Sequence, residues 1–175
     1  QTSALRNNLQ AEFGEKMTVE FAMRYGTPTI ADVLQNMLQG GVRKLLVLPL
    51  YPQYSATTTG STFDAIAADL HGRRWIPDLR FVTHYHDDPA YIEAIANSVR
   101  VYREEHGQAD KLMFSFHGLP KRNLEEGDPY HCECLKTSRL IAEKLGLKEG
   151  DYLTTFQSRF GRQEWLQPYT DKTLE

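Results

Sequence analysis

The residue best suited to chemistry in this sequence is His117, which directly follows the apolar stretch Leu112 to Phe116. That stretch has the pattern of a buried strand, and Gly118 and Pro120 end it. A neutral imidazole can accept a proton or bind a metal ion, although one ring nitrogen cannot do both at once. If the strand belongs to a parallel sheet, His117 lies at a carboxyl-terminal strand end, where open α/β sheets hold their ligands. His117 is therefore the first candidate for catalysis or metal binding.

Polar and aromatic residues follow the other predicted strands as well. They occur at Arg24–Tyr25, at 49–61, at His84–Tyr85–His86 and at Gln157–Ser158–Arg159. Because the carboxyl ends of parallel strands share one edge of a sheet, these residues predict a lined crevice at that edge. Aromatic residues that could give the crevice flat apolar walls are Tyr51, Tyr54, Tyr85, Phe160, Trp165 and Tyr169. Taken alone, an aromatic residue of this kind belongs more often to the hydrophobic core than to a site wall.

Two further groups consist of residue types that bind metals. Cys132 and Cys134 lie two positions apart beside His131, but the sequence has no second cysteine pair to complete a site. Residues two apart face different directions on a helix, so this pair does not predict a metal centre. His84 and His86 would point to the same side of a strand, which suits a shared metal ion. Because they follow the polar end of that strand, a solvent-exposed pair is the simpler interpretation.

The loop 57–62 (TTTGST) combines hydroxyl side chains with a glycine before a predicted helix. Backbone N–H groups in such a loop can bind phosphate at a helix N-terminus. The spacing is similar to the phosphate loop of flavodoxins, so a flavin-binding electron carrier is one alternative function. In flavodoxins the loop directly follows a strand, whereas residues 50–56 intervene here. A capped helix start without a ligand explains the same residues.

Helices and strands must position these groups, and the two alternate along the sequence. Apolar residues at helical spacing predict helices near 3–14, 30–38, 63–70, 88–105 and 130–145. Alternating or continuous apolar runs predict strands near 19–23, 45–48, 79–83, 112–116 and 152–156. This alternation requires right-handed βαβ units and predicts an α/β fold of doubly wound parallel sheets. The segment 106–110 is the best candidate for a domain boundary.

The composition is that of an ordinary globular chain, with 175 residues, 41% hydrophobic and 25% charged. A net charge of −3 argues against a strongly basic surface, so we expect no nucleic-acid partner. The longest apolar run, 45–51, is too short to cross a bilayer, and no secretory signal is recognisable. The cytoplasm is therefore the expected compartment. Because the sequence begins without methionine and ends inside a pattern, we expect it to be an internal piece of a longer chain.

Several of these segments, in this order, resemble ferrochelatase, the family that inserts ferrous iron into a porphyrin to make haem. The matching segments are Arg24–Tyr25, Pro49–Ser61 (PLYPQYSATTTGS), Ser115–Pro120 (SFHGLP), Gly127–Tyr130 (GDPY) and Phe156–Gly161 (FQSRFG). The last of them is extended by Trp165–Leu166 and Pro168–Thr170. Together these segments span nearly the whole chain, and they resemble the Gram-negative members, which use protoporphyrin IX.

The resemblance implies roles for particular residues. His117 matches the family's active-site histidine, so it is expected to be the catalytic residue and a ligand of the entering iron. The expected substrate-binding residues are Arg24, Tyr25, Tyr85, Gln157, Ser158 and Trp165. In the family an acidic residue faces the histidine across the cleft, and its position is expected beyond Glu175.

The family fold is two Rossmann-like domains with the porphyrin cleft between them. On that template, residues 1–106 are the later part of the first domain and residues 107–175 are the first part of the second. Because both domains would be incomplete, we expect this chain alone to be inactive. Some members bind a [2Fe–2S] cluster through a loop cysteine where this sequence has Ala56, so no cluster is expected from this segment. The resemblance also leaves open a peripheral association with the inner membrane.

Other functions remain compatible with the same residues. One is a tetrapyrrole chelatase that uses cobalt or nickel, and another is a porphyrin-binding module without turnover. Protoporphyrin and coproporphyrin are not separated by these motifs. The flavodoxin-like electron carrier is the alternative from a different class.

Overall fold

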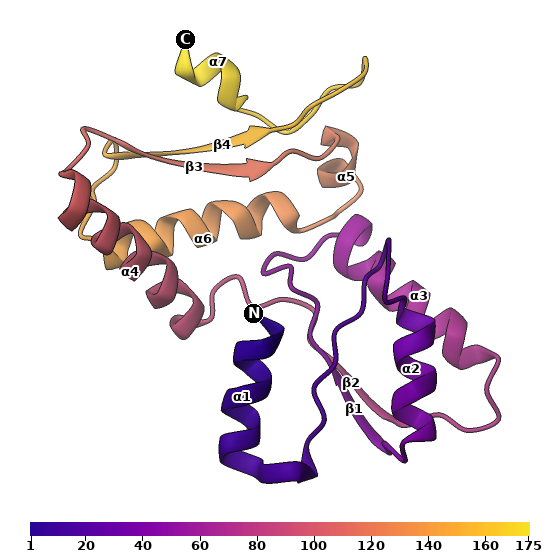
Figure 1. The fold of residues 1–175 in the computed structure, drawn as a ribbon. Coiled ribbons are helices and arrows are strands. Elements are labelled where there is room, and N and C mark those ends of the chain that lie inside the picture. The colour runs from indigo at the N-terminus through magenta and orange to yellow at the C-terminus, as the bar shows by residue number, and fades with distance from the viewer. The chain divides into compact units, whose positions relative to one another are not determined.

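The computed structural model describes residues 1–175, apart from the side chain of Glu15. The chain is divided into two compact units, one made of Gln1–Leu48 with Ser61–Val82 and the other of Pro49–Gly60 with Thr83–Glu175. Each unit contains one pair of parallel strands and several helices (Figure 1). The predicted α/β class with parallel strands is therefore confirmed. Among the described residues, no helix is long and apolar enough to span a membrane.

The first unit is built around the parallel strands β1 (Lys44–Val47) and β2 (Asp78–Phe81). Its helices are α1 (Thr2–Phe13), α2 (Ile30–Gln39) and α3 (Ser61–His71), and the 3₁₀ turn η1 (Gly14–Lys16) follows α1. The core consists of residues from α2, β1 and α3, namely Leu34, Leu45, Ile66 and Leu70. At the start of α2, the Thr29 hydroxyl accepts a hydrogen bond from the Asp32 N–H, which satisfies a free backbone donor.

The second unit is built around the parallel strands β3 (Leu112–His117) and β4 (Tyr152–Gln157). Its helical segments are the π-helix η2 (Ala56–Gly60), α4 (Pro89–His106), α5 (Lys121–Glu125), α6 (Tyr130–Lys144) and α7 (Thr170–Leu174). Helices α4 and α6 lie on one side of the β3–β4 pair, and α7 lies on the other (Figure 1). The buried clusters of this unit are Ile92, Ala96 and Ile141, and Cys134, Phe156 and Leu166.

All the predicted long helices are present, and side chains cap the N-termini of α2 and α4. Helix α4 is the clearest case, because the Asp88 side chain accepts hydrogen bonds from the N–H groups of Ala90 and Tyr91, and Pro89 occupies the first turn. The short helices α5 and α7 and the π-helix η2 were not predicted. Each has five residues, which is too few for an apolar period to be recognised.

The predicted strand at 19–23 is wrong. In this stretch only Met23 forms a bridge, a single isolated one with Thr29. Phe21 and Met23 are exposed, so their alternation with polar residues does not cover a core. The chain passes from the first compact unit into the second for the last time between residues 82 and 83. The helix that follows, α4, packs against α6 of the second unit. The expected division at residue 106 of two Rossmann-like domains in a complete chain stays a prediction.

The two cysteines of α6 differ in exposure, which leads to a first prediction. Cys132 is exposed, whereas Cys134 is fully buried against Phe156 and Leu166. Burial also raises the pKa of the Cys134 thiol to about 12. We expect the thiol reagent DTNB to label only Cys132 in the native protein and both cysteines after unfolding in guanidinium. Cys132→Ala should remove the native labelling and Cys134→Ala should leave it, whereas rapid native labelling of Cys134 would contradict the prediction.

Candidate functional site

His117 is the last residue of β3 and pairs in register with Gln157, the last residue of β4. Both side chains are exposed at the carboxyl ends of neighbouring parallel strands. The Tyr130 hydroxyl donates a hydrogen bond to the His117 carbonyl at 2.9 Å, which ties the strand end to the first turn of α6. The structure therefore brings together the predicted catalytic histidine and one predicted substrate-binding residue, at the edge where α/β sheets hold ligands.

The chain leaves β3 in a close turn at Gly118. The Gly118 N–H donates to the Gln157 carbonyl at 2.7 Å. A Cβ at Gly118 would lie 2.8 Å from that carbonyl oxygen and 3.3 Å from Cε3 of Trp165, so a side chain does not fit there. Trp165 is only 5% exposed, and its Nε1–H donates to the Phe160 carbonyl at 3.0 Å. In this structure Trp165 supports the turn next to His117, and its role in substrate binding stays a prediction.

Ser158 directly follows β4 and has an unusual backbone conformation. Its φ of 70° is the only positive value among the non-glycine residues that the structure describes. The next residue, Arg159, lies 3.9 Å from the centre of the Tyr169 ring and donates to the Asp171 carboxylate at 2.7 Å. These contacts hold the segment after β4, and they leave the Ser158 side chain exposed beside the strand end.

Tyr85 lies in the segment between β2 and α4. Its ring packs edge-on against Tyr91 of α4, with 5.5 Å between the ring centres. Its N–H donates to the Pro52 carbonyl at 2.9 Å. Burial of the ring raises the pKa of the Tyr85 hydroxyl. Tyr85 is thus packed between α4 and the loop at Pro52, and its predicted contact with substrate stays a prediction.

Arg24 and Tyr25 belong to the first compact unit. The Arg24 Nε–H contacts both the carbonyl and the hydroxyl of Ser61, each at 3.0 Å. The guanidinium also lies 4.5 Å from the centre of the Tyr25 ring, which is 74% exposed. Because both contacts to Ser61 use Nε, the arginine is held by its inner nitrogen, and its terminal nitrogens form the end that can bind a carboxylate.

The hydroxyl-rich loop before α3 is held by a carboxylate. The Ser55 hydroxyl and the Ala56 N–H donate to the same oxygen of Asp128, at 2.8 and 2.9 Å. The other oxygen of Asp128 accepts from the Tyr130 N–H at 3.0 Å. Asp128 thus already accepts from two donors that directly precede the 57–62 loop. This contact explains why the GDPY segment accompanies the loop, and it does not favour a flavin phosphate site.

A cluster of His84, His86 and Glu133 lies elsewhere in the second unit. The Nδ1 atoms of His84 and His86 lie 2.8 and 3.3 Å from the two carboxylate oxygens of Glu133. The prediction of a solvent-exposed histidine pair is wrong for His86, which is 6% exposed. Burial lowers the pKa of His86, although the Glu133 carboxylate acts in the opposite direction.

Glu133 could not be recognised from the sequence as part of this cluster, because it lies on α6, far along the chain from the two histidines. The only local signal was its position between Cys132 and Cys134, neither of which belongs to the cluster. One ligand atom from each of the three residues lies within 4.8 Å of the others. Among the described residues, this is the group whose arrangement could hold a metal ion.

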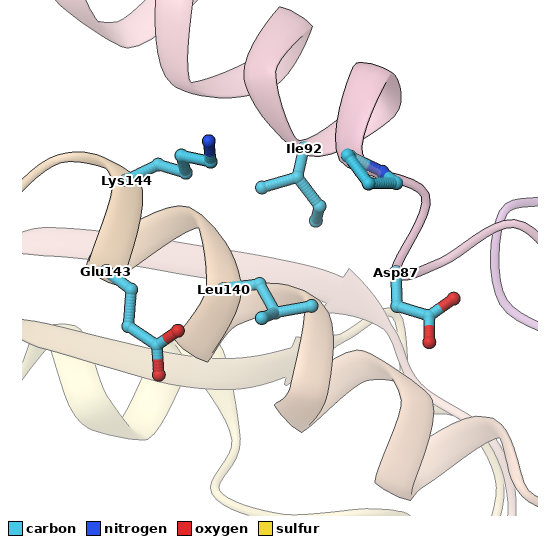
Figure 2. Close-up of a pocket in the computed structure, with 6 residues that line it drawn as sticks. Asp87, Ile92, Leu140, Glu143 and Lys144 are labelled. Atoms are coloured by element: carbon cyan, nitrogen blue, oxygen red, sulfur yellow. The ribbon is translucent and has the colours of Figure 1, made fainter.

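Two surface pockets lie in the second unit. The larger, about 340 Å³, is lined by Asp87, Pro89, Ile92, Leu140, Glu143 and Lys144. Figure 2 shows Ile92 of α4 facing Leu140 of α6, with Asp87 and Lys144 at opposite ends. The smaller, about 270 Å³, is lined by Lys121, Leu124, His131, Glu164, Trp165, Leu166 and Gln167. Of the predicted site residues, only Trp165 lines either of these pockets.

Comparison with known proteins agrees with the resemblance of the motifs. The family model described as Ferrochelatase matches residues 1–175. Ferrochelatase of Pseudoalteromonas atlantica is 63% identical over the whole chain, which covers 49% of that relative. The ferrochelatases of Idiomarina loihiensis and Marinobacter nauticus are 62% and 61% identical over the whole chain, which covers 48% and 47% of them.

The chain thus spans about half the length of the curated relatives that it matches. The family model nevertheless extends over every residue of the chain, from the Arg24 segment to the region beyond Trp165. The histidine at the end of β3, the GDPY segment and the segment after β4 all lie within this match. On this evidence the chain belongs to the ferrochelatase family.

Proposed function

We propose that the protein containing this chain inserts ferrous iron into protoporphyrin IX, the terminal step of haem biosynthesis. The observation that carries the proposal is the exposed His117 at the carboxyl end of β3, paired with Gln157 at the end of β4. Identities of up to 63% with relatives named Ferrochelatase support the same function. Iron is a substrate in this reaction and not a resident cofactor.

The reaction requires that two pyrrole N–H protons leave the porphyrin while a divalent ion enters from one face. We propose that neutral His117 accepts one of these protons or binds the arriving iron, the two tasks for which its ring nitrogens are suited. An acidic residue beyond Glu175 would be its partner. The segment after β4, with Gln157 and Ser158, would border the bound macrocycle.

Arg24 is the proposed partner of a porphyrin propionate. A guanidinium can hold a carboxylate through two parallel hydrogen bonds, which fixes orientation as well as charge. The contacts of Nε with Ser61 restrict the rotation of the Arg24 side chain, so less conformational entropy would be lost on binding. The exposed ring of Tyr25, stacked on the guanidinium, would offer an apolar surface beside the propionate. Tyr85 and Trp165 complete the proposed set of substrate-binding residues.

Further properties are proposed for the whole protein. Ala56 stands where cluster-binding members have a cysteine, which supports the absence of a [2Fe–2S] cluster bound through this loop. The net charge of −3 supports a protein without a nucleic-acid partner. We further propose that the protein works in the cytoplasm, either free or in peripheral association with the inner membrane.

The direct test is an anaerobic assay of the full-length protein with Fe²⁺ and protoporphyrin IX, followed by the loss of porphyrin fluorescence and the gain of haem absorbance. We expect turnover with Fe²⁺, and no flavin absorbance in the purified protein. A clear preference for Co²⁺ or Ni²⁺ would indicate another chelatase, and porphyrin binding without turnover would indicate a binding module. Haem formation no faster than the uncatalysed reaction would overturn the proposal.

The same assay tests the chain in isolation. We expect the 175 residues alone to give only the uncatalysed rate, because the acidic partner of His117 is expected beyond Glu175.

A further inference from the structure

We propose that His84, His86 and Glu133 form a binding site for a divalent transition-metal ion such as Zn²⁺. Two imidazoles and one carboxylate are a ligand set that such ions prefer in proteins. One donor atom from each residue lies within 4.8 Å of the others, so a single ion can reach all three. The site does not include His117, and the proposal does not rest on iron insertion.

The first independent observation is a buried nitrogen without a partner. Nδ1 of His86 makes no hydrogen bond in the structure, although it is shielded from solvent. It lies 3.3 Å from a Glu133 oxygen, but the two atoms are not aligned for a hydrogen bond. Buried polar atoms are nearly always satisfied by a donor, an acceptor or an ion. A metal ion between Nδ1 and the carboxylate would satisfy both groups.

The second observation is the charge of Glu133. Glu133 is 7% exposed and, among the described ion pairs, its carboxylate contacts only histidines and no lysine or arginine. One of its oxygens also accepts from the Tyr54 N–H at 2.7 Å. A buried carboxylate is costly unless a positive group compensates it. A divalent cation supplies that charge, whereas neutral imidazoles do not.

The surrounding contacts hold the buried ligands in place. The Thr137 hydroxyl donates to the His86 carbonyl at 2.8 Å and accepts from the Gln53 amide at 3.0 Å. Nε2 of His86 lies 3.9 Å from the Asp87 carboxylate, which is within ion-pair distance but beyond hydrogen-bond distance. Metal-binding histidines commonly direct their second nitrogen at a carboxylate or carbonyl, which orients the ring. His86 and Glu133 are therefore preorganised for an ion that lies between them.

His84 is the ligand that must adjust. Ligand atoms bonded at about 2.1 Å to a tetrahedral ion lie about 3.4 Å apart. His86 Nδ1 already lies 3.3 Å from Oε2 of Glu133, whereas His84 Nδ1 lies 2.8 Å from the other oxygen, Oε1. The His84 side chain is 50% exposed, so it can move outward by the small amount required. Its exposure also gives the ion a way in and leaves a fourth position for water.

The test measures Zn²⁺ binding to the full-length protein carrying His117→Ala, so that an ion at the proposed catalytic histidine does not contribute. The protein is first treated with a chelator, and Zn²⁺ is then titrated in competition with a chromophoric indicator. We expect one Zn²⁺ per chain, and an affinity at least about tenfold weaker after His84→Ala or Glu133→Gln. His71→Ala is the matched control, because it removes an exposed imidazole that is not part of the cluster.

A second measurement separates loss of a ligand from loss of the fold. At one Zn²⁺ concentration, the ion should raise the Tm of the His117→Ala parent and of its His71→Ala variant, and should raise the Tm of its His84→Ala variant less, because weaker binding gives less stabilisation. Because His84 is exposed, this variant is expected to fold even if Glu133→Gln does not. Failure of the parent protein to bind Zn²⁺, or equal Zn²⁺ affinity of the His84→Ala and His71→Ala variants, would overturn the proposal.

Discussion

Replacement of His117 by alanine is expected to slow iron insertion by the full-length protein about 10²–10⁴-fold, the range associated with loss of a positioned proton acceptor. His117 is exposed at the end of β3, so its side chain makes little contribution to the core. The strand end is held instead by backbone contacts, including the hydrogen bond from the Tyr130 hydroxyl to the His117 carbonyl. The substitution should therefore lower kcat while leaving the circular dichroism spectrum and the Tm close to those of the parent.

The matched control for this substitution is His106→Ala, which removes an exposed imidazole at the end of α4. This variant should retain the parent rate of iron insertion. Binding of protoporphyrin to the His117→Ala variant, measured by quenching of intrinsic fluorescence, should remain. Undiminished insertion of Fe²⁺ or Zn²⁺ by His117→Ala would remove the central role assigned to this histidine.

Replacement of Gly118 by alanine is expected to lower both stability and activity. The new Cβ would lie 2.8 Å from the Gln157 carbonyl oxygen and 3.3 Å from the Trp165 ring, and the first of these is a backbone atom that cannot rotate away. The strand ends must separate or the indole must shift, which should cost about 1–3 kcal/mol of unfolding free energy. Because His117 and Gln157 lie at these strand ends, iron insertion should fall as well.

Urea denaturation of the full-length protein, with the insertion assay alongside, tests this expectation. Gly72→Ala is the control, because a Cβ there would meet only the Asp69 carbonyl, at 3.8 Å. Its unfolding free energy should lie within about 0.5 kcal/mol of the parent value. If Gly118→Ala were as stable and as active as Gly72→Ala, the close turn would not be a constraint on the site.

Features that depend on neighbouring residues could be predicted from the sequence alone. Apolar residues at helical spacing predicted the long helices, and α2, α3 and α4 bury residues of these apolar faces. The apolar run before His117 predicted a strand that ends at a histidine, and the structure has this strand as β3. The motifs also predicted the family, which the match over residues 1–175 confirms. The alternation of apolar and polar residues at 19–23 led to a wrong prediction of a strand. Such alternation gives a strand only where a neighbouring strand is available to pair with it.

Contacts between residues far apart in the sequence depend on tertiary packing and could not be predicted. Asp128 binds the loop at Ser55, and Glu133 contacts His84 and His86, although the partners lie far apart in the sequence. No local period encodes such a contact, because it depends on where α6 packs beside the loops that precede it. For the same reason the exposure of His86 could not be judged from its polar neighbours. The type of each element is a local property of the chain, whereas the grouping of donors, acceptors and charges around a site is a property of how the elements pack.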